Sequence, residues 1–299
     1  MSTPDPSERR RQFRALHQDG CFLLPNPWDP GSARYLQSAG FKALASTSAG
    51  HAWSQGQVDG AEGLEQVLAH LREMSAATPL PLNADFGDGF GKTPAEVEQA
   101  VRRAIDTGVA GLSIEDATPD PLQRVRPLDE ALVRLRAARA AIDRSGADVM
   151  LVGRAENFFV GRPDIDDTLL RLRAYADAGA DCLYAPGIVQ RAHIEAVVAA
   201  VAPKPVNLLV GGPSAYSLQD IAAMGVRRVS LGGALARVAW GGLMHATRLL
   251  QEQGSFAGLE GAIPGATLNA LFDPRPGGQP LTGRTDPGQP IPTVPAQGT

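Results

Sequence analysis

The sequence predicts an α/β fold, a (β/α)₈ barrel of the TIM type in which parallel strands alternate with helices. Two observations support this prediction. Eight short apolar runs of strand character recur along the 299 residues, and amphipathic segments with apolar residues at helical spacing lie between most of them. A doubly wound open sheet is the alternative, but no Gly-x-Gly-x-x-Gly motif follows the first apolar run.

The individual elements follow from this alternation. Strands are expected at residues 21–25, 43–47, 80–85, 111–115, 149–154, 182–185, 206–210 and 228–231. Helices are expected at residues 61–76, 94–107, 128–145, 164–178 and 194–201. Asp164 and Ser217 are suitable helix-start residues, and Gly108 and Gly179 are suitable helix stops.

The C-terminal part of the sequence changes character after the eighth predicted strand. Residues 235–254 predict an additional helix, and residues 264–272 are expected to be ordered, so the catalytic domain is placed at residues 1–272. From residue 273 to residue 299 Pro and Gly dominate, with few aromatic residues and no periodicity. This composition predicts a disordered tail that lies outside the site.

Composition and charge narrow the possible partners. The formal net charge is −4 and no basic block is present, so nucleic acid is not an expected partner. No apolar run is long enough to span a bilayer, and the polar, Arg-rich N-terminus has no apolar stretch of the signal-peptide type. We therefore expect a cytoplasmic protein that does not bind membranes.

The scarcity of lysine and cysteine excludes further chemistry. Lys42 and Lys204 lie at the starts of predicted strands, the wrong end of a barrel for an active site, and Lys92 lies on a polar loop. A Schiff-base or pyridoxal-phosphate mechanism needs a lysine amine in the site, so neither is expected. Cys21 and Cys182 lie inside apolar runs and are interpreted as core residues.

Carboxylates gather at the predicted strand ends. Asp85 and Asp88 follow an apolar strand in a glycine-rich turn, and Asp59, Glu115 and Glu156 lie at or near the ends of other strands. Acids that converge on one point repel one another unless a cation lies between them, which indicates a hard metal with oxygen ligands, Mg²⁺. The alternative is that each acid caps the helix that follows it.

Other polar residues are predicted at the same end of the barrel. They are Asn26, Asp29, Ser46, Thr47, Ser48, Asp116, Arg154 and Asn207. Hydroxyls, an amide and a guanidinium suit a bound carboxylate, while the acids suit a cation. His51 follows the Ser-Thr-Ser turn, and its role as an acid or base in the site, or as a solvated loop residue, is left open.

Several motifs, in their order and spacing, resemble the isocitrate lyase/phosphoenolpyruvate mutase superfamily over residues 10–255. They are Pro-x-x-Trp-Asp-Pro-Gly-Ser-Ala-Arg at 25–34, Ser-Thr-Ser-Ala-Gly at 46–50, Ala-Asp-Phe-Gly-Asp-Gly-Phe-Gly at 84–91, Ser-Ile-Glu-Asp at 113–116, Gly-Arg-Ala-Glu-Asn at 153–157 and Gly-Gly-Ala-Leu-Ala-Arg at 232–237. The resemblance implies a barrel whose last helix is exchanged between subunits, as a homodimer or homotetramer. It also implies Mg²⁺ and a small 2-oxo or 2-hydroxy carboxylate.

The resemblance also suggests a role for each site residue. Asp85 resembles the direct metal ligand, with Asp59 and Glu115 in a water-mediated shell. Arg154 resembles the arginine that neutralises the oxygen of a pyruvate-type enolate, and we expect it to act in catalysis with Glu156. Ser46, Thr47, Ser48, Asp85, Arg154 and Asn207 would contact the substrate.

Three departures from the superfamily pattern affect the expected reaction. The superfamily's second acid falls at Gly87, and Asp88 one residue later is the candidate replacement. The segment 117–127 lacks the lysine–cysteine motif of the lyases, and Pro186 stands where they have a glutamate. A C–C lyase or decarboxylase of a 2-oxo acid is therefore favoured, oxaloacetate decarboxylase-like or isocitrate/methylisocitrate lyase-like. A phosphoenolpyruvate or phosphonopyruvate mutase or hydrolase, using Arg124 or Arg126, and a non-catalytic 2-oxo acid binder are the alternatives.

Overall fold

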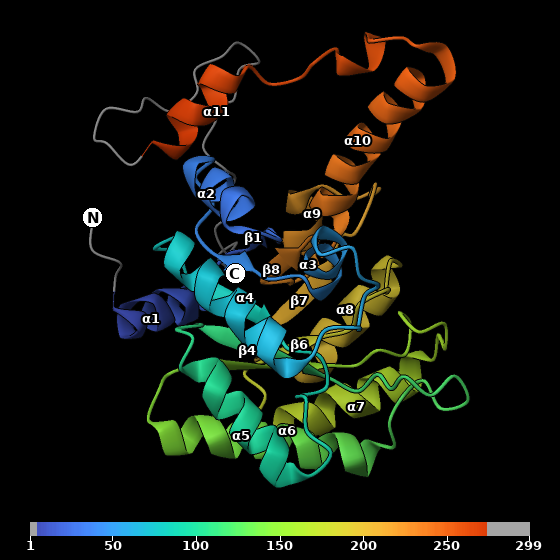
Figure 1. Ribbon diagram of the computed structural model, residues 1–299. Helices are drawn as coiled ribbons and strands as arrows, with labels where there is room; N and C mark the ends of the chain where they lie inside the picture. The colour runs from blue at the N-terminus through green and yellow to red at the C-terminus, as the bar shows by residue number, and fades with distance from the viewer. Residues whose placement is uncertain (1–4, 274–299) are drawn as a thin grey trace.

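Eight parallel strands form the centre of the protein, of which this computed structural model describes residues 5–273 (Figure 1). The strands are β1 (Phe22–Leu24), β2 (Leu44–Ala45), β3 (Leu82–Asp85), β4 (Gly111–Glu115), β5 (Met150–Arg154), β6 (Cys182–Tyr184), β7 (Val206–Leu209) and β8 (Arg228–Ser230). Their order in the sheet is β1-β8-β7-β6-β5-β4-β3-β2, so strands β2 to β8 lie in sequence order and β1 pairs with β8. This topology confirms the predicted barrel.

The barrel closes between β1 and β2 through contacts at and just beyond the ends of the two strands. The Ala45 amide donates a hydrogen bond to the Pro25 carbonyl (3.1 Å). The Asn26 side chain donates to the Ser46 carbonyl (2.9 Å) and accepts hydrogen bonds from the Leu231 and Gly232 amides. Asn26 therefore joins the ends of β1, β2 and β8.

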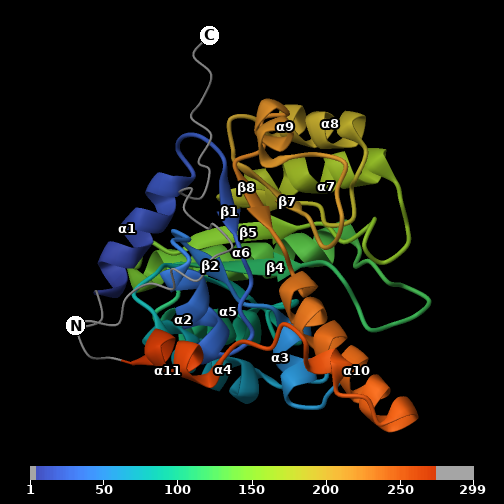
Figure 2. The same cartoon turned by 90° about the horizontal axis from the view of Figure 1, so that it is seen from above.

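Helices surround the barrel, as the view in Figure 2 shows. Those that precede β8 are α1 (Pro6–Leu16), α2 (Pro30–Ser38), α3 (Ser48–Ser54), α4 (Leu64–Ala77), α5 (Pro94–Ile105), α6 (Leu128–Ser145), α7 (Ile165–Asp177), α8 (Arg191–Val201) and α9 (Leu218–Ala223). The bounds of β4 and α6 are those predicted. The second strand is shorter than predicted because Thr47 caps α3, its side chain accepting a hydrogen bond from the Gly50 amide.

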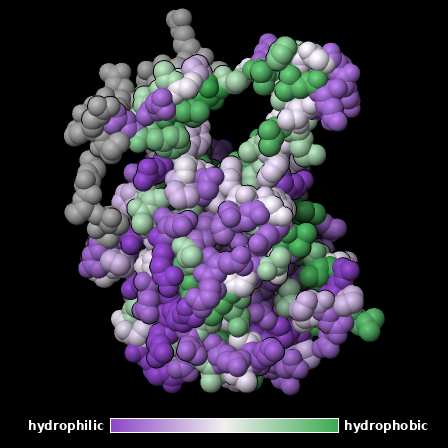
Figure 3. Space-filling model, in the orientation of Figure 1, coloured by the Kyte–Doolittle hydropathy of each residue, from purple (hydrophilic) through white to green (hydrophobic). Residues whose placement is uncertain are grey.

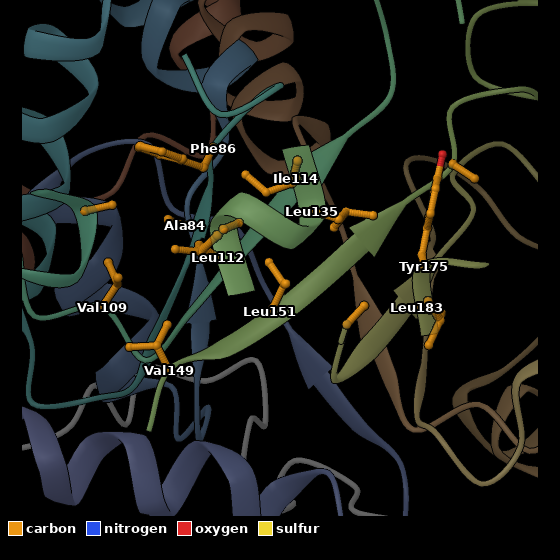
Figure 4. Close-up of a cluster of buried hydrophobic side chains, with 14 of the residues drawn as sticks. Ala84, Phe86, Val109, Leu112, Ile114, Leu135, Val149, Leu151, Tyr175 and Leu183 are labelled. Carbon is orange, nitrogen blue, oxygen red and sulfur yellow. The ribbon is translucent and has the colours of Figure 1, made fainter. Parts of the chain in front are cut away.

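Two apolar layers hold the barrel together. The outer layer lies between strands and helices and includes Phe86, Leu112, Leu135 and Leu151, part of the cluster in Figure 4. The inner layer fills the barrel and includes Phe13 of α1, Phe22, Met150 and Val152 among others. Because Phe13 is fully buried among these inward-facing residues, α1 closes the N-terminal end of the barrel.

The segment after β8 leaves the barrel. Helix α10 (Ala234–Gln253) projects outward, and after the short η1 (Ala257–Leu259) the chain returns so that α11 (Gly265–Phe272) lies beside α2 (Figures 1 and 2). Only Ala236 of α10 is buried. Exposed apolar residues of this arm are Val238, Trp240, Leu243, Met244, Leu250, Phe256, Leu259, Ile263, Leu268 and Phe272. Figure 3 shows hydrophobic residues gathered along it.

Two further expectations concern membrane-spanning helices and the C-terminal tail. Within residues 5–273, no helix combines the length and apolar character needed to cross a membrane. Of the predicted disordered tail, residues 274–299 lie outside the described residues.

Candidate active site

A cavity of about 260 Å³ opens at the C-terminal ends of the strands. Its wall includes the predicted residues Asn26, Ser46, Thr47, Ser48, Asp59, Asp85, Arg154 and Asn207. Except for Asn207, which is the second residue of β7, these residues lie at strand ends or in the segments that follow them, which is where the active sites of barrel enzymes are built. The structure thus brings most of the predicted site residues together around one space.

Asp85, the last residue of β3, lies at the centre of the polar contacts. Its Oδ2 accepts hydrogen bonds from the Ser48 amide (3.1 Å) and the Ser48 hydroxyl (3.0 Å), and its Oδ1 accepts one from Arg154 Nη1 (3.0 Å). Its own amide donates to the Ser46 hydroxyl (2.8 Å). The Ser-Thr-Ser turn therefore positions Asp85, while Thr47 starts α3.

Arg154, the last residue of β5, joins the acids of three strand ends. Nη1 lies 3.0 Å from both Asp85 Oδ1 and Glu115 Oε2, and Nε forms an ion pair with Glu156. The guanidinium also lies over the Tyr184 ring, 5.2 Å from its centroid. Neither Glu115 nor Glu156 lines the cavity, so these two acids act on it through Arg154.

Burial changes the pKa values of the charged groups around Arg154. Burial raises the pKa of Glu115 to about 8 and that of Glu156 to about 6, although Arg154 opposes both shifts. Burial also raises the pKa of Asp59. For Arg154, burial alone would lower the pKa, but Glu156, Glu115 and Asp85 together hold it above its ordinary value.

A buried contact between His51 and Glu62 connects α3 to the loop that presents Asp59. His51 of α3 pairs with Glu62, which lies three residues after Asp59, and both side chains are largely buried. The His51 ring stacks on His70 of α4 with centroids 3.7 Å apart, and burial lowers the pKa of His70 to about 3. His51 does not line the cavity, and its contact with Glu62 joins α3 to the loop between Asp59 and α4.

Asp88 is not brought to the cavity, in contrast to its predicted place among the metal ligands. Its carboxylate pairs with Arg126 Nη2 (2.5 Å) and Arg134 Nη1 (3.3 Å). Gly87 adopts a positive φ of 49°, which turns the chain between the two acids. The Asp88 carboxylate thus contacts two arginines away from the cavity wall, and Arg126, the candidate phosphonate ligand, is already paired. Arg124 donates to the Val160 carbonyl (3.2 Å).

Two further predicted acids have structural partners. Asp29 caps α2 by accepting a hydrogen bond from the Ser32 amide (2.6 Å). Asp116 is buried and accepts hydrogen bonds from the Glu156 amide (2.8 Å), the Tyr175 hydroxyl (2.5 Å) and Arg171 (3.1 Å). Asp116 thus fixes the backbone that presents Glu156.

Several cavity residues were not predicted. Asn83, Ser113, Tyr184, Arg228, Ser230 and Arg237 all line the space. Asn207, which was predicted, donates to the Ser230 hydroxyl (2.9 Å) and accepts from Arg228 Nε (2.8 Å). Asn83 precedes Asp85 by two residues on β3, so strand periodicity alone places both on the inner face.

The donor set fits a magnesium ion. Asp85 and Asp59 line the cavity and offer hard oxygen ligands. Mg²⁺ is commonly held by one or two carboxylates, with waters completing its shell. Within residues 5–273, no group of three or more His, Cys, Asp or Glu side chains is placed to hold a metal ion, so a magnesium site here would have fewer protein ligands than that.

Comparisons with known proteins identify the family of the chain. The family model for phosphoenolpyruvate phosphomutase matches residues 13–251. The chain belongs to the isocitrate lyase/phosphoenolpyruvate mutase superfamily. A curated member, the oxaloacetate decarboxylase of Paraburkholderia xenovorans, is 30% identical over 236 residues, 75% of this chain and 74% of its own.

Solved structures place the chain in the same superfamily. A Burkholderia cenocepacia protein described as a lyase or mutase is 44% identical, with a TM-score of 0.87 over 89% of this chain and 97% of its own. Oxaloacetate acetylhydrolase, solved with its product oxalate, is 29% identical, with a TM-score of 0.79 over 90% of this chain and 95% of its own. Superfamily members with these names are lyases, hydrolases and mutases, which supports an enzymatic role.

Proposed function

We propose that this protein is a Mg²⁺-dependent lyase or decarboxylase that acts on a small 2-oxo or 2-hydroxy carboxylate. The observation that supports this most directly is the convergence of Asp85, Glu115 and Glu156 on Arg154 at the mouth of the barrel. Asp85 and Asp59 would hold the metal, and Glu115 would lie close to them through its ion pair with Arg154. The ion, when bound, supplies positive charge that favours an enolate over its ketone.

The residues of the chain have distinct roles in this proposal. In a decarboxylation, the bond between C3 and the leaving carboxylate breaks, its electron pair forms the enolate, and a proton is later added at C3. Arg154 is directed at the enolate oxygen, where a preorganised donor stabilises the transition state more than the ground state. Glu156 keeps the guanidinium in place, while Ser46, Ser48 and Asn207 orient the substrate carboxylate.

Two observations favour decarboxylation over an isocitrate-type cleavage. The segment 117–127 forms a small hairpin with a bridge between Ala117 and Val125, and its sequence lacks the cysteine that would donate a proton. Buried Pro186 offers no carboxylate after β6. A decarboxylation, which needs only enolate stabilisation, requires neither the cysteine nor the glutamate at these positions. The phosphonopyruvate alternative is weaker because Arg126 is paired with Asp88.

A substrate panel with Mg²⁺ tests the proposal. Oxaloacetate, methylisocitrate, 2,3-dimethylmalate and phosphonopyruvate are offered in turn, and the products identify the class. We expect CO₂ and pyruvate from oxaloacetate, or a 2-oxo acid from one of the longer substrates. Phosphate or phosphoenolpyruvate would instead support the mutase or hydrolase alternative. Tight oxalate binding without turnover of any substrate would support a non-catalytic binder.

We further propose a homo-oligomer, a dimer or a tetramer assembled from dimers. Helix α10 presents Val238, Trp240, Leu243 and Met244 to solvent in the single chain. Exposed apolar surface of this extent is typical of an interaction site, and an exchanged helix would cover it. Light scattering at micromolar concentration is expected to give a multiple of the 31.4 kDa chain mass, and a pure monomer would contradict this.

A further inference from the structure

Arg228 is a buried cation at the floor of the cavity. It is the first residue of β8, and only 2% of its surface is exposed to solvent. It lines the same cavity as Asp85 and Arg154. Within residues 5–273 it forms no ion pair with a carboxylate, whereas Arg154 contacts three acids. A buried charge without a counter-ion is costly, so a paired state is favoured.

The acceptors around Arg228 are all uncharged. Nε donates to Asn207 Oδ1 (2.8 Å), and Nη1 lies 3.3 Å from Asn83 Oδ1 and 3.4 Å from His17 Nε2. His17 Nδ1 lies 2.8 Å from the Phe13 carbonyl, which can only accept, so Nδ1 carries the proton and Nε2 presents a lone pair. Nη2 has no hydrogen-bond partner among the described residues.

Other buried arginines have roles that Arg228 lacks. Arg9 donates to the Ser75 carbonyl near the end of α4, and Arg10 donates to the Ile105 and Val109 carbonyls at and beyond the end of α5. Cations are stabilised at helix C-termini. Arg171 pairs with Asp116 and Asp167. In the described part of the chain, Arg228 contacts neither a carbonyl at a helix end nor an acid, and instead adjoins the cavity.

We propose that Arg228 binds the second carboxylate of a dicarboxylic substrate. This inference rests on the proposed function, in which the first carboxylate and the adjoining oxygen lie near Asp85. Asn83, which contacts Arg228, lies two residues before Asp85 on β3, a rise of roughly 6.6 Å. A four-carbon chain can extend across such a step. A guanidinium binds a carboxylate with paired N–H donors, and Nη2 has no partner among residues 5–273.

Arg237 is the competing candidate, and it provides the matched control. It also lines the cavity, on α10, and its Nη1 donates to the Gly211 carbonyl (3.4 Å). Its side chain is exposed, so water already solvates its charge. A substrate carboxylate at Arg237 would lie at the rim, whereas one at Arg228 would lie inside the barrel.

The test compares two ligands that differ only at the far end. Malate carries a carboxylate where 2-hydroxybutanoate carries a methyl group. Calorimetry with Mg²⁺ present gives the affinity of each for the parent protein and for Arg228→Met and Arg237→Met, with oxalate as a ligand that occupies only the metal end. We expect the parent protein to bind malate about tenfold or more tightly than 2-hydroxybutanoate, because a hydrogen bond to a charged group contributes a binding free energy of that size.

The outcomes separate this inference from the proposed function. Arg228→Met is expected to remove the malate preference and keep oxalate affinity, while Arg237→Met keeps both. A parent protein without a malate preference, or a preference removed only by Arg237→Met, overturns the inference. Failure of oxalate to bind the parent protein would count against the proposed function instead. If Arg228→Met does not fold, Arg228→Lys is expected to reduce the preference, because lysine lacks the planar pair of donors.

Discussion

Arg154 Nη1 and Asp85 Oδ1 lie 3.0 Å apart, and the two residues come from the ends of β5 and β3. This contact links the proposed metal ligand to the proposed enolate-stabilising group. Because Arg154 also contacts Glu115 and Glu156, its guanidinium is held from three sides. Such preorganisation is what electrostatic stabilisation of a transition state requires.

Arg154→Lys is expected to lower kcat by about a hundredfold, because one preorganised donor at a developing oxyanion is worth on the order of 3 kcal/mol. Lysine keeps the charge but loses the planar fork that reaches several acids at once. Steady-state kinetics and melting temperature are measured on the same preparation. If turnover stays within about threefold while the melting temperature falls, Arg154 has only a structural role.

Glu115 gives a pH dependence of stability. Its pKa in the folded protein, about 8, lies above its ordinary value of 4.5, so the folded state holds this proton more tightly. The resulting stabilisation is complete below about pH 4.5 and is lost as the pH rises through about 8. Without metal, the melting temperature of Glu115→Gln should therefore fall less than that of the parent protein between pH 6 and pH 8.5. Equal losses in the two proteins would show that Glu115 is ionised throughout.

Part of this site could be predicted from the sequence because the rule for barrels is positional. Asp85, Glu115 and Arg154 end strands whose apolar character is plain, so their meeting followed from the fold. Asp88 does not line the cavity because a turn with positive φ at Gly87 directs it toward Arg126 and Arg134. No pattern of apolar residues encodes that turn.

Other residues could not be predicted because their roles depend on tertiary contacts. Arg228 begins β8, the end of a strand where sites are not expected, and only the depth of the cavity shows its position. The contact of His51 with Glu62 depends on the path of the loop between α3 and α4. Neither residue has a spacing that identifies its partner.

Glu62→Gln is expected to weaken Mg²⁺ binding by about tenfold, since residues that orient a metal ligand have effects of this size. The reason is that we expect the ion pair between Glu62 and His51 to hold the loop that presents Asp59. Calorimetric titration with Mg²⁺ measures the change. Glu65→Gln is the matched control, because Glu65 is exposed and pairs with Arg103 on the outer surface. Unchanged Mg²⁺ affinity in Glu62→Gln would remove the proposed positioning role.

The magnesium affinity of Asp85→Ala, measured by calorimetry beside that of Asp88→Ala, tests the central claim most directly. The two acids share one turn, but Asp85 lines the cavity and Asp88 pairs with two arginines outside it. We predict that Asp85→Ala stays folded and binds Mg²⁺ more than about a hundredfold more weakly, because it removes a direct ligand, while Asp88→Ala stays within about threefold of the parent. Parent-like affinity in Asp85→Ala would contradict the account.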